Sequence, residues 1–177
     1  MGMRLAIYNF GMFRERAESP ANQGFRDREP ANFSAAEHAP GFIGRAGYAD
    51  EPGQESWGVQ VYPRFYVERG DGWAPSTLSL WTDIESLMTF TYSGIHAEAL
   101  RRAADWFVPK DWPAYVLWWV GKDHWPDWHE AVERFELLHD RGSTPEAFTF
   151  KAPFDAAGNP AVIDRAAVKR IAAAGRP

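Results

Sequence analysis

The sequence predicts an α+β domain in which helices cover one face of a mixed or antiparallel sheet. Short apolar runs alternate with helical patterns along the chain, and no internal repeat or long apolar span interrupts them. The 177 residues, of which 45% are hydrophobic, are enough to close one core. One domain is therefore expected.

Four main strands are expected, at residues 5–10, 42–48, 76–81 and 114–120, and a short last strand is expected at 147–150. The third alternates polar and apolar side chains from Ser76 to Trp81, which is typical of a half-buried strand. The fourth is apolar on both faces, which indicates a central position in the sheet. Because neighbours on a strand face opposite sides, Trp118 and Trp119 must enter different layers.

Helices are expected at residues 31–38, after Asp83, over 96–107, after Asp127 and over 164–174. Asp83 and Asp127 are suited to cap their helices, and Glu130 is expected to reach back and complete a capping box. The element order gives two strand–helix–strand halves. That order predicts a ferredoxin-like antiparallel sheet with its helices on one face.

Residues 1–150 are assigned to this single domain, and residues 151–177 to a C-terminal extension. Within the domain, residues 50–75 combine several glycines and prolines with Trp57, Tyr66, Trp73 and other aromatic residues. Linkers are polar, so this aromatic segment is expected to cover part of the domain rather than to connect two units.

Composition excludes several classes of protein. The chain has no cysteine, which excludes a disulfide scaffold and a thiolate site, and its net charge of -5 argues against a nucleic-acid partner. No run is long and apolar enough for a membrane span or a signal peptide, so we expect a cytoplasmic protein without a membrane partner. The unusual feature is the aromatic content of 15%.

Familiar catalytic motifs are missing from the chain. No glycine-rich phosphate loop and no Gly-x-Ser-x-Gly elbow occurs. His124 and His129 could contribute to a zinc site, but Pro126 separates them and no third ligand has a suitable spacing, so no metal is expected.

His96 is the histidine whose position best suits chemistry. It lies at the start of a predicted helix, on the side of Leu100 and Phe107, with Tyr92 four residues before it. An imidazole at the mouth of an apolar face can act as a general base or as an axial ligand of haem. A buried histidine packed on Tyr92 with no further role is the alternative.

The segments that carry a family resemblance are Leu80-Trp81 and residues 93–107, 115–120 and 142–150. From about Leu5 to Phe150 the chain resembles a bacterial family catalogued as domain of unknown function 3291. That family is similar to the dimeric α/β-barrel superfamily, in which two ferredoxin-like subunits join their sheets. Its members include monooxygenases that need no cofactor, cyclases, isomerases and haem enzymes.

The resemblance implies a homodimer through the sheet faces and a cavity between each sheet and its helices. We expect a small-molecule enzyme that acts on a bulky apolar or aromatic metabolite by cofactor-independent oxygenation, isomerisation or cyclisation. His96 is the expected base, and Arg101 or Tyr92 would stabilise an oxyanion. The expected substrate-binding residues are Trp81, Trp106, Trp57, Tyr66, Trp73 and Trp119. A haem-binding protein and a non-catalytic small-molecule-binding module are the alternatives.

Overall fold

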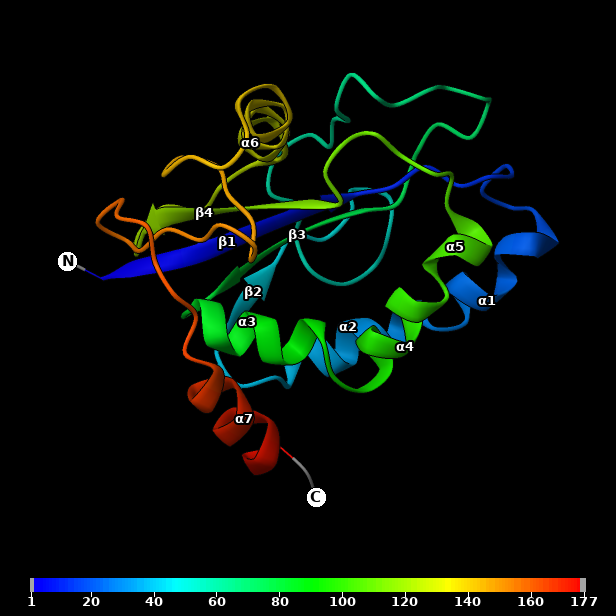
Figure 1. Ribbon diagram of the computed structural model, residues 1–177. Coiled ribbons are helices and arrows are strands. Elements are labelled where there is room, and N and C mark those ends of the chain that lie inside the picture. Colours follow the sequence, from blue (N-terminus) through cyan, green and yellow to red (C-terminus); the bar gives the residue numbers. More distant parts are fainter. Residues whose placement is uncertain (1, 176–177) are drawn as a thin grey trace.

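The computed structural model describes residues 2–175 and contains one four-stranded antiparallel sheet. The order across the sheet is β2-β3-β1-β4, which places the first strand of the chain at its centre (Figure 1). The strands are β1 (Met3–Phe10), β2 (Phe42–Arg45), β3 (Ser76–Trp81) and β4 (Tyr115–Gly121). The expected α+β class and the four main strands are confirmed, although β4 lies at the side of the sheet rather than at its centre.

The pairing of β1 sets two cores on opposite faces of the sheet. Tyr8 lies opposite Leu78 of β3 and Val116 of β4. Because side chains alternate along a strand, the even-numbered residues of β1 enter one core and Leu5 and Ile7 enter the other. The sheet is therefore buried on both faces within a single chain.

One face is covered by helices α2 (Glu29–Glu37), α3 (Ile84–Thr91) and α4 (Gly94–Arg101), which lie below the sheet in Figure 1. Asp83 caps α3, accepting a hydrogen bond from the backbone nitrogen of Ser86 at 2.7 Å. The core beneath α3 is made by large side chains that are at most 1% exposed: Leu5, Trp81, Leu87, Leu117 and Phe148.

The opposite face is covered by helix α6 (Trp128–Arg141), which lies above the sheet in Figure 1. Tyr8 packs edge-on against Phe135 and Trp128 of this helix, with ring centroids 5.5 and 6.3 Å apart. The expectation that helices cover one face is therefore wrong. The sheet face expected to join a second subunit is occupied by α6 and residues 50–75 of the same chain.

The adjacent tryptophans of β4 enter the two layers, as expected. Trp118 faces α6 and donates its indole N–H to Glu130 at 2.9 Å. Trp119 faces the other core and donates to the backbone oxygen of Phe154 at 2.8 Å. Asp127 caps α6, but the Glu130 carboxylate points inward to Trp118 and His124, so the expected capping box does not form.

Residues 50–75 contain no strand or helix and are held to the rest of the domain by two of their own arginines. Arg64 pairs with Glu136 and Asp140 of α6. Arg69 donates to the backbone oxygen of Phe13 at 2.7 Å. The segment thus covers the α6 side of the domain.

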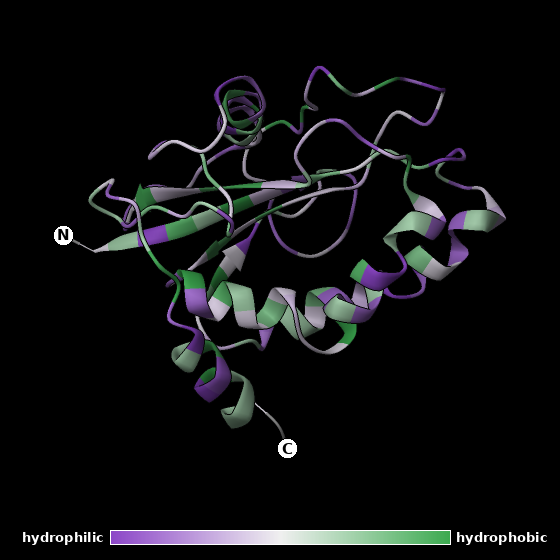
Figure 2. Cartoon of the chain, viewed as in Figure 1, coloured by the Kyte–Doolittle hydropathy of each residue, from purple (hydrophilic) through white to green (hydrophobic). Residues whose placement is uncertain are grey.

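The C-terminal residues complete the core under the sheet instead of extending from it. Ile163 is buried there, and Asp164 caps helix α7 (Arg165–Ala174), which lies against α3. Hydrophilic and hydrophobic residues alternate around α7 (Figure 2), and one side of this helix is half-buried. The domain therefore continues past residue 150.

The remaining elements are short. They are the 3-10 helix Pro20–Asn22 and the helices α1 (Gln23–Arg26) and α5 (Ala103–Trp106). The helix expected over 96–107 is divided into α4 and α5, and the strand expected at 147–150 is reduced to an isolated bridge between Leu117 and Phe148. Within residues 2–175, no helix has the length and apolarity needed to cross a membrane.

Candidate functional site

A cleft of about 300 Å³ lies between helix α2 and the chain that leaves β2. Three side chains spaced four residues apart on α2 form one wall, and a second set from residues 45–54 forms the other. These six residues are Glu29, Phe33, Glu37, Arg45, Tyr48 and Glu51.

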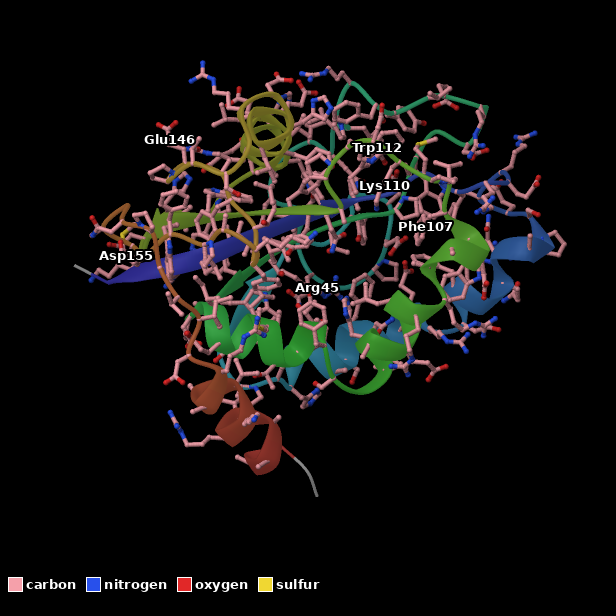
Figure 3. The ribbon with its side chains drawn as sticks, in the orientation of Figure 1. Arg45, Phe107, Lys110, Trp112, Glu146 and Asp155 are labelled. Carbon is pink, nitrogen blue, oxygen red and sulfur yellow. The ribbon has the colours of Figure 1, made fainter. Side chains whose placement is uncertain are left out.

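Arg45 is the central side chain of the cleft. It extends from β2 toward α2 (Figure 3), where its Nε donates to Glu37 Oε1 at 2.9 Å and its guanidinium lies 4.0 Å from the ring centroid of Phe33. Gln54 donates to the same Glu37 oxygen at 3.0 Å. Within residues 2–175, the two terminal amino groups of Arg45 have no hydrogen-bond partner, although the side chain is only 16% exposed.

Glu29 shares the cleft with Arg45. Burial raises the pKa of its carboxyl group, and the nearby charge of Glu51 raises it further, while Arg45 partly offsets both effects. A carboxylate whose pKa is raised is a stronger base than an ordinary carboxylate. Glu29 is therefore suited to act as an acid or a base.

Tyr48 closes the inner end of the cleft. Its hydroxyl donates to the backbone oxygen of Ser76 at 2.7 Å, and its ring stacks on Trp128 with centroids 5.9 Å apart. Burial raises the pKa of this hydroxyl well above its usual range. The Tyr48 side chain therefore stays uncharged and is held in place as part of the cleft wall.

Gly47 brings the far wall of the cleft close to β2. A Cβ at this position would overlap the backbone oxygen of Gln54, and the Gly47 N–H donates to the backbone oxygen of Glu55 at 2.8 Å. The absence of a side chain is therefore what allows residues 50–54 to fold back over the cleft.

Of the residues expected from the sequence, His96 and Trp81 are linked through Phe90. The imidazole of His96 lies 4.9 Å from the ring of Phe90, which in turn stacks on Trp81 at 5.2 Å. The Trp81 indole N–H donates to Ser79, which is the strand partner of Arg45. This group therefore lies on the same face of the sheet as the cleft but does not line it.

The ring of His96 is oriented by the backbone. If Nδ1 carries the proton, it donates to the Thr91 backbone oxygen at 2.9 Å and leaves Nε2 as an acceptor. Burial lowers the pKa of the imidazole, and the hydrogen bond to Thr91 opposes this effect. His96 is thus held mainly in its neutral form.

The other two expected catalytic residues are more exposed. Tyr92 is 56% exposed and packs its ring against Phe150, and Arg101 lies at the solvent-exposed end of α4. Neither lines the cleft.

The remaining expected aromatic residues are distributed over separate clusters. Trp57 packs on Trp125, Tyr66 stacks on Tyr62, Trp73 and Trp106 pack near Phe13 and Phe25, and Trp119 holds the C-terminal segment. The structure therefore does not bring the expected substrate-binding set together in one pocket.

The residue patterns of the sequence do not mark Glu29, Phe33, Glu37, Arg45 or Tyr48 as site residues. A partial signal was present, because residues spaced by four lie on one side of a helix. That spacing indicates that Glu29, Phe33 and Glu37 lie on the same side of α2. It does not indicate that Arg45 of β2 packs against them.

Comparison with known proteins gives a match to one family. Residues 4–164 match the family described as Domain of unknown function (DUF3291), which extends beyond the Phe150 limit expected from the sequence. No curated protein and no solved structure matches the chain. In the part of the chain that the structure describes, no three histidine, aspartate or glutamate side chains are placed to hold a metal ion.

Proposed function

The chain belongs to the family described as Domain of unknown function (DUF3291), and we propose that it is an enzyme that moves a proton on a compact small molecule in the Arg45 cleft. The observation that carries the proposal is the pairing of Glu29, whose pKa is raised, with an arginine whose terminal amino groups have no partner in residues 2–175. One group exchanges protons and the other binds an oxygen atom.

These two groups supply the parts of a proton-transfer reaction. The Glu29 carboxylate removes a proton from a carbon next to a carbonyl group, and the electron pair of that C–H bond moves to the carbonyl oxygen as an enolate. The guanidinium of Arg45 stabilises the negative oxygen. Return of the proton from Glu29 to the far carbon of a C=C bond conjugated with the enolate completes an isomerisation. Attack of the enolate carbon on a second carbonyl carbon of the same molecule, whose oxygen then takes the proton from Glu29, gives a cyclisation.

The volume and the lining residues of the cleft limit the ligands that it can bind. A volume of about 300 Å³ is at the lower end for ligand pockets, so we propose a compact ligand in place of the bulky metabolite expected from the sequence. Haem does not fit this cleft, because the lining contains no histidine and its three glutamates would repel the haem propionates. The acid–base reactions need only side chains that the cleft contains.

The fold supports a distant relation to ferredoxin-like proteins. The order β2-β3-β1-β4, with helices after β1 and β3, is the arrangement expected for two strand–helix–strand halves. We propose that the domain is a ferredoxin-like unit whose second sheet face is covered by its own helix α6. Its cleft is lined by α2 and by the chain that leaves β2.

Proton exchange with solvent tests the function without knowledge of the product. Compact aromatic ketones and keto acids, such as phenylpyruvate, are incubated with the protein in deuterated water, and loss of the proton signal next to the carbonyl group is followed by NMR. The proposal predicts faster exchange than without protein for at least one compound. Exchange at the background rate throughout the panel contradicts it.

Glu29→Gln is the decisive variant in this experiment, because it keeps the shape of the side chain and removes its basicity. Glu55→Gln is the matched control, since Glu55 is exposed and does not line the cleft. We expect exchange to be lost in the first variant and retained in the second. Ligand binding without any exchange would instead identify a non-catalytic small-molecule-binding module.

A further inference from the structure

The charged groups of the cleft are not equally available to a ligand. Glu37 is engaged by Arg45 and by Gln54 on one oxygen. Neither Glu29 nor Glu51 has a salt bridge within residues 2–175, and Glu51 is exposed at the rim. A ligand therefore meets one partly engaged arginine and two unpaired acidic side chains.

The geometry of Arg45 favours an oxygen acceptor. Its Nε is fixed by Glu37 and its plane lies over Phe33, so the orientation of the terminal amino groups is set before a ligand arrives. A planar guanidinium with two free amino groups matches a carboxylate or a carbonyl oxygen. The side chain is also largely withdrawn from water, which strengthens such a contact.

An anionic group alone would not suit this cleft. Glu29 and Glu51 lie close enough for the charge of one to raise the pKa of the other. A simple carboxylate ligand would add a third negative group to them, whereas a positively charged nitrogen near Glu51 would relieve their repulsion. The charge pattern is therefore complementary to a molecule with both kinds of group.

We infer that the ligand of the Arg45 cleft is a compact amphoteric molecule, with a carboxylate or carbonyl oxygen bound by Arg45 and a protonated amine held by Glu51. This substrate class rests on the proposed function of the same cleft. An amine next to the reacting carbon also places the C–H bond between Arg45 and the two glutamates, where Glu29 acts on it. Phe33 and Tyr48 also line the cleft, and they offer the ligand an apolar contact of modest size.

Equilibrium binding of three related probes tests the inference. Phenylalanine carries both charged groups, hydrocinnamate lacks the amine, and phenethylamine lacks the carboxylate. We expect phenylalanine to bind about tenfold or more tightly than either of the others, as measured by calorimetry at millimolar concentrations. Equal binding of the three, tighter binding of a single-charge probe, or no binding of any probe overturns the inference.

Two variants show which residue recognises which group. In the Glu51→Gln variant, phenylalanine should no longer bind more tightly than hydrocinnamate. In the Arg45→Lys variant, phenylalanine should no longer bind more tightly than phenethylamine, because lysine lacks the planar guanidinium that binds a carboxylate through two N–H groups. Glu55→Gln serves as the exposed control outside the cleft. An unchanged preference in the folded Glu51→Gln protein overturns the amine contact.

This binding result is separate from the proposed catalysis. Selective phenylalanine binding without proton exchange in any compound would keep the ligand class and reject the enzyme. Proton exchange on ketones that lack an amine, without preference for the amphoteric probe, would keep the enzyme and reject the ligand class.

Discussion

The guanidinium of Arg45 lies 4.0 Å from the ring centroid of Phe33 and ties strand β2 to helix α2. The pairing of Arg45 with Glu37, 2.9 Å away, holds the same two elements. Since the lining of the cleft comes from α2 and from the chain that begins in β2, these contacts fix its shape. The candidate acid–base site therefore lies where helix α2 meets strand β2, the next element along the chain.

Glu29→Gln is expected to stabilise the protein at neutral pH. The folded-state pKa of Glu29 is raised above its ordinary value of 4.5, so ionisation costs more in the folded than in the unfolded chain. The stability linked to this group is complete below pH 4.5 and is lost as the pH rises through the folded-state pKa. Thermal unfolding should show a higher midpoint for the variant at neutral pH and nearly equal midpoints in acid, and the opposite pH trend would contradict this.

Gly47→Ala should open the cleft. The added Cβ forces the Gln54 backbone away, and we expect a loss of about 2 kcal/mol in the free energy of unfolding. Gly121→Ala is the matched control, because nothing lies within 4 Å of a Cβ there. Chemical denaturation measures the cost, and limited proteolysis should cut residues 50–54 faster in the first variant only. Equal stability of the two variants would show that this close approach is absent.

Tyr8→Phe and Tyr48→Phe should differ although each removes one hydroxyl. Tyr8 is 0% exposed, and its hydroxyl has no hydrogen-bond partner within residues 2–175, so its removal should leave stability unchanged or raise it slightly. Tyr48 donates to the Ser76 backbone oxygen, and losing this bond should cost about 1 kcal/mol. Chemical denaturation of the two variants under identical conditions compares their free energies of unfolding. A larger loss of stability for Tyr8→Phe than for Tyr48→Phe would contradict this prediction.

Ile163→Ala tests whether the C-terminal residues belong to the core. Ile163 is 7% exposed and packs in the core under α3, so we expect a loss of about 3 kcal/mol. The neighbouring Val162 is 94% exposed, and Val162→Ala should stay within about 0.5 kcal/mol of the parent. Equal effects of the two substitutions would mean that the segment after residue 150 is an appendage.

Local signals in the sequence were sufficient for much of the fold. The alternation of polar and apolar residues gave β3 its bounds of Ser76–Trp81, and Asp83 and Asp127 cap their helices as expected. These features depend on residues close in sequence. The apolar residues Trp128, Ala131 and Phe135, spaced by three and four positions, indicate a helix with one packed side, but this spacing does not indicate which face of the sheet the helix covers.

The site depends on contacts between different elements of the chain, which the residue pattern within one element does not encode. Arg45 meets Glu37 across a turn, and Glu130 reaches Trp118 and His124 instead of its own helix start. The aromatic residues pointed to a pocket, but most of them fill separate clusters of the core. The lining of the cleft instead includes the charged residues Glu29, Glu37, Arg45 and Glu51, which come from α2 and from the chain that begins in β2.

The titration of Glu29 tests the central claim most directly. Carbon NMR of protein labelled at the glutamate carboxyl carbons, with Glu29→Gln used to assign the signal, reports the protonation of this side chain. We expect the Glu29 signal to titrate above 4.5, and we expect its titration to change when phenylalanine binds in the cleft. A signal that titrates at or below 4.5 and does not respond to the probe would contradict the proposal that this cleft is the acid–base site.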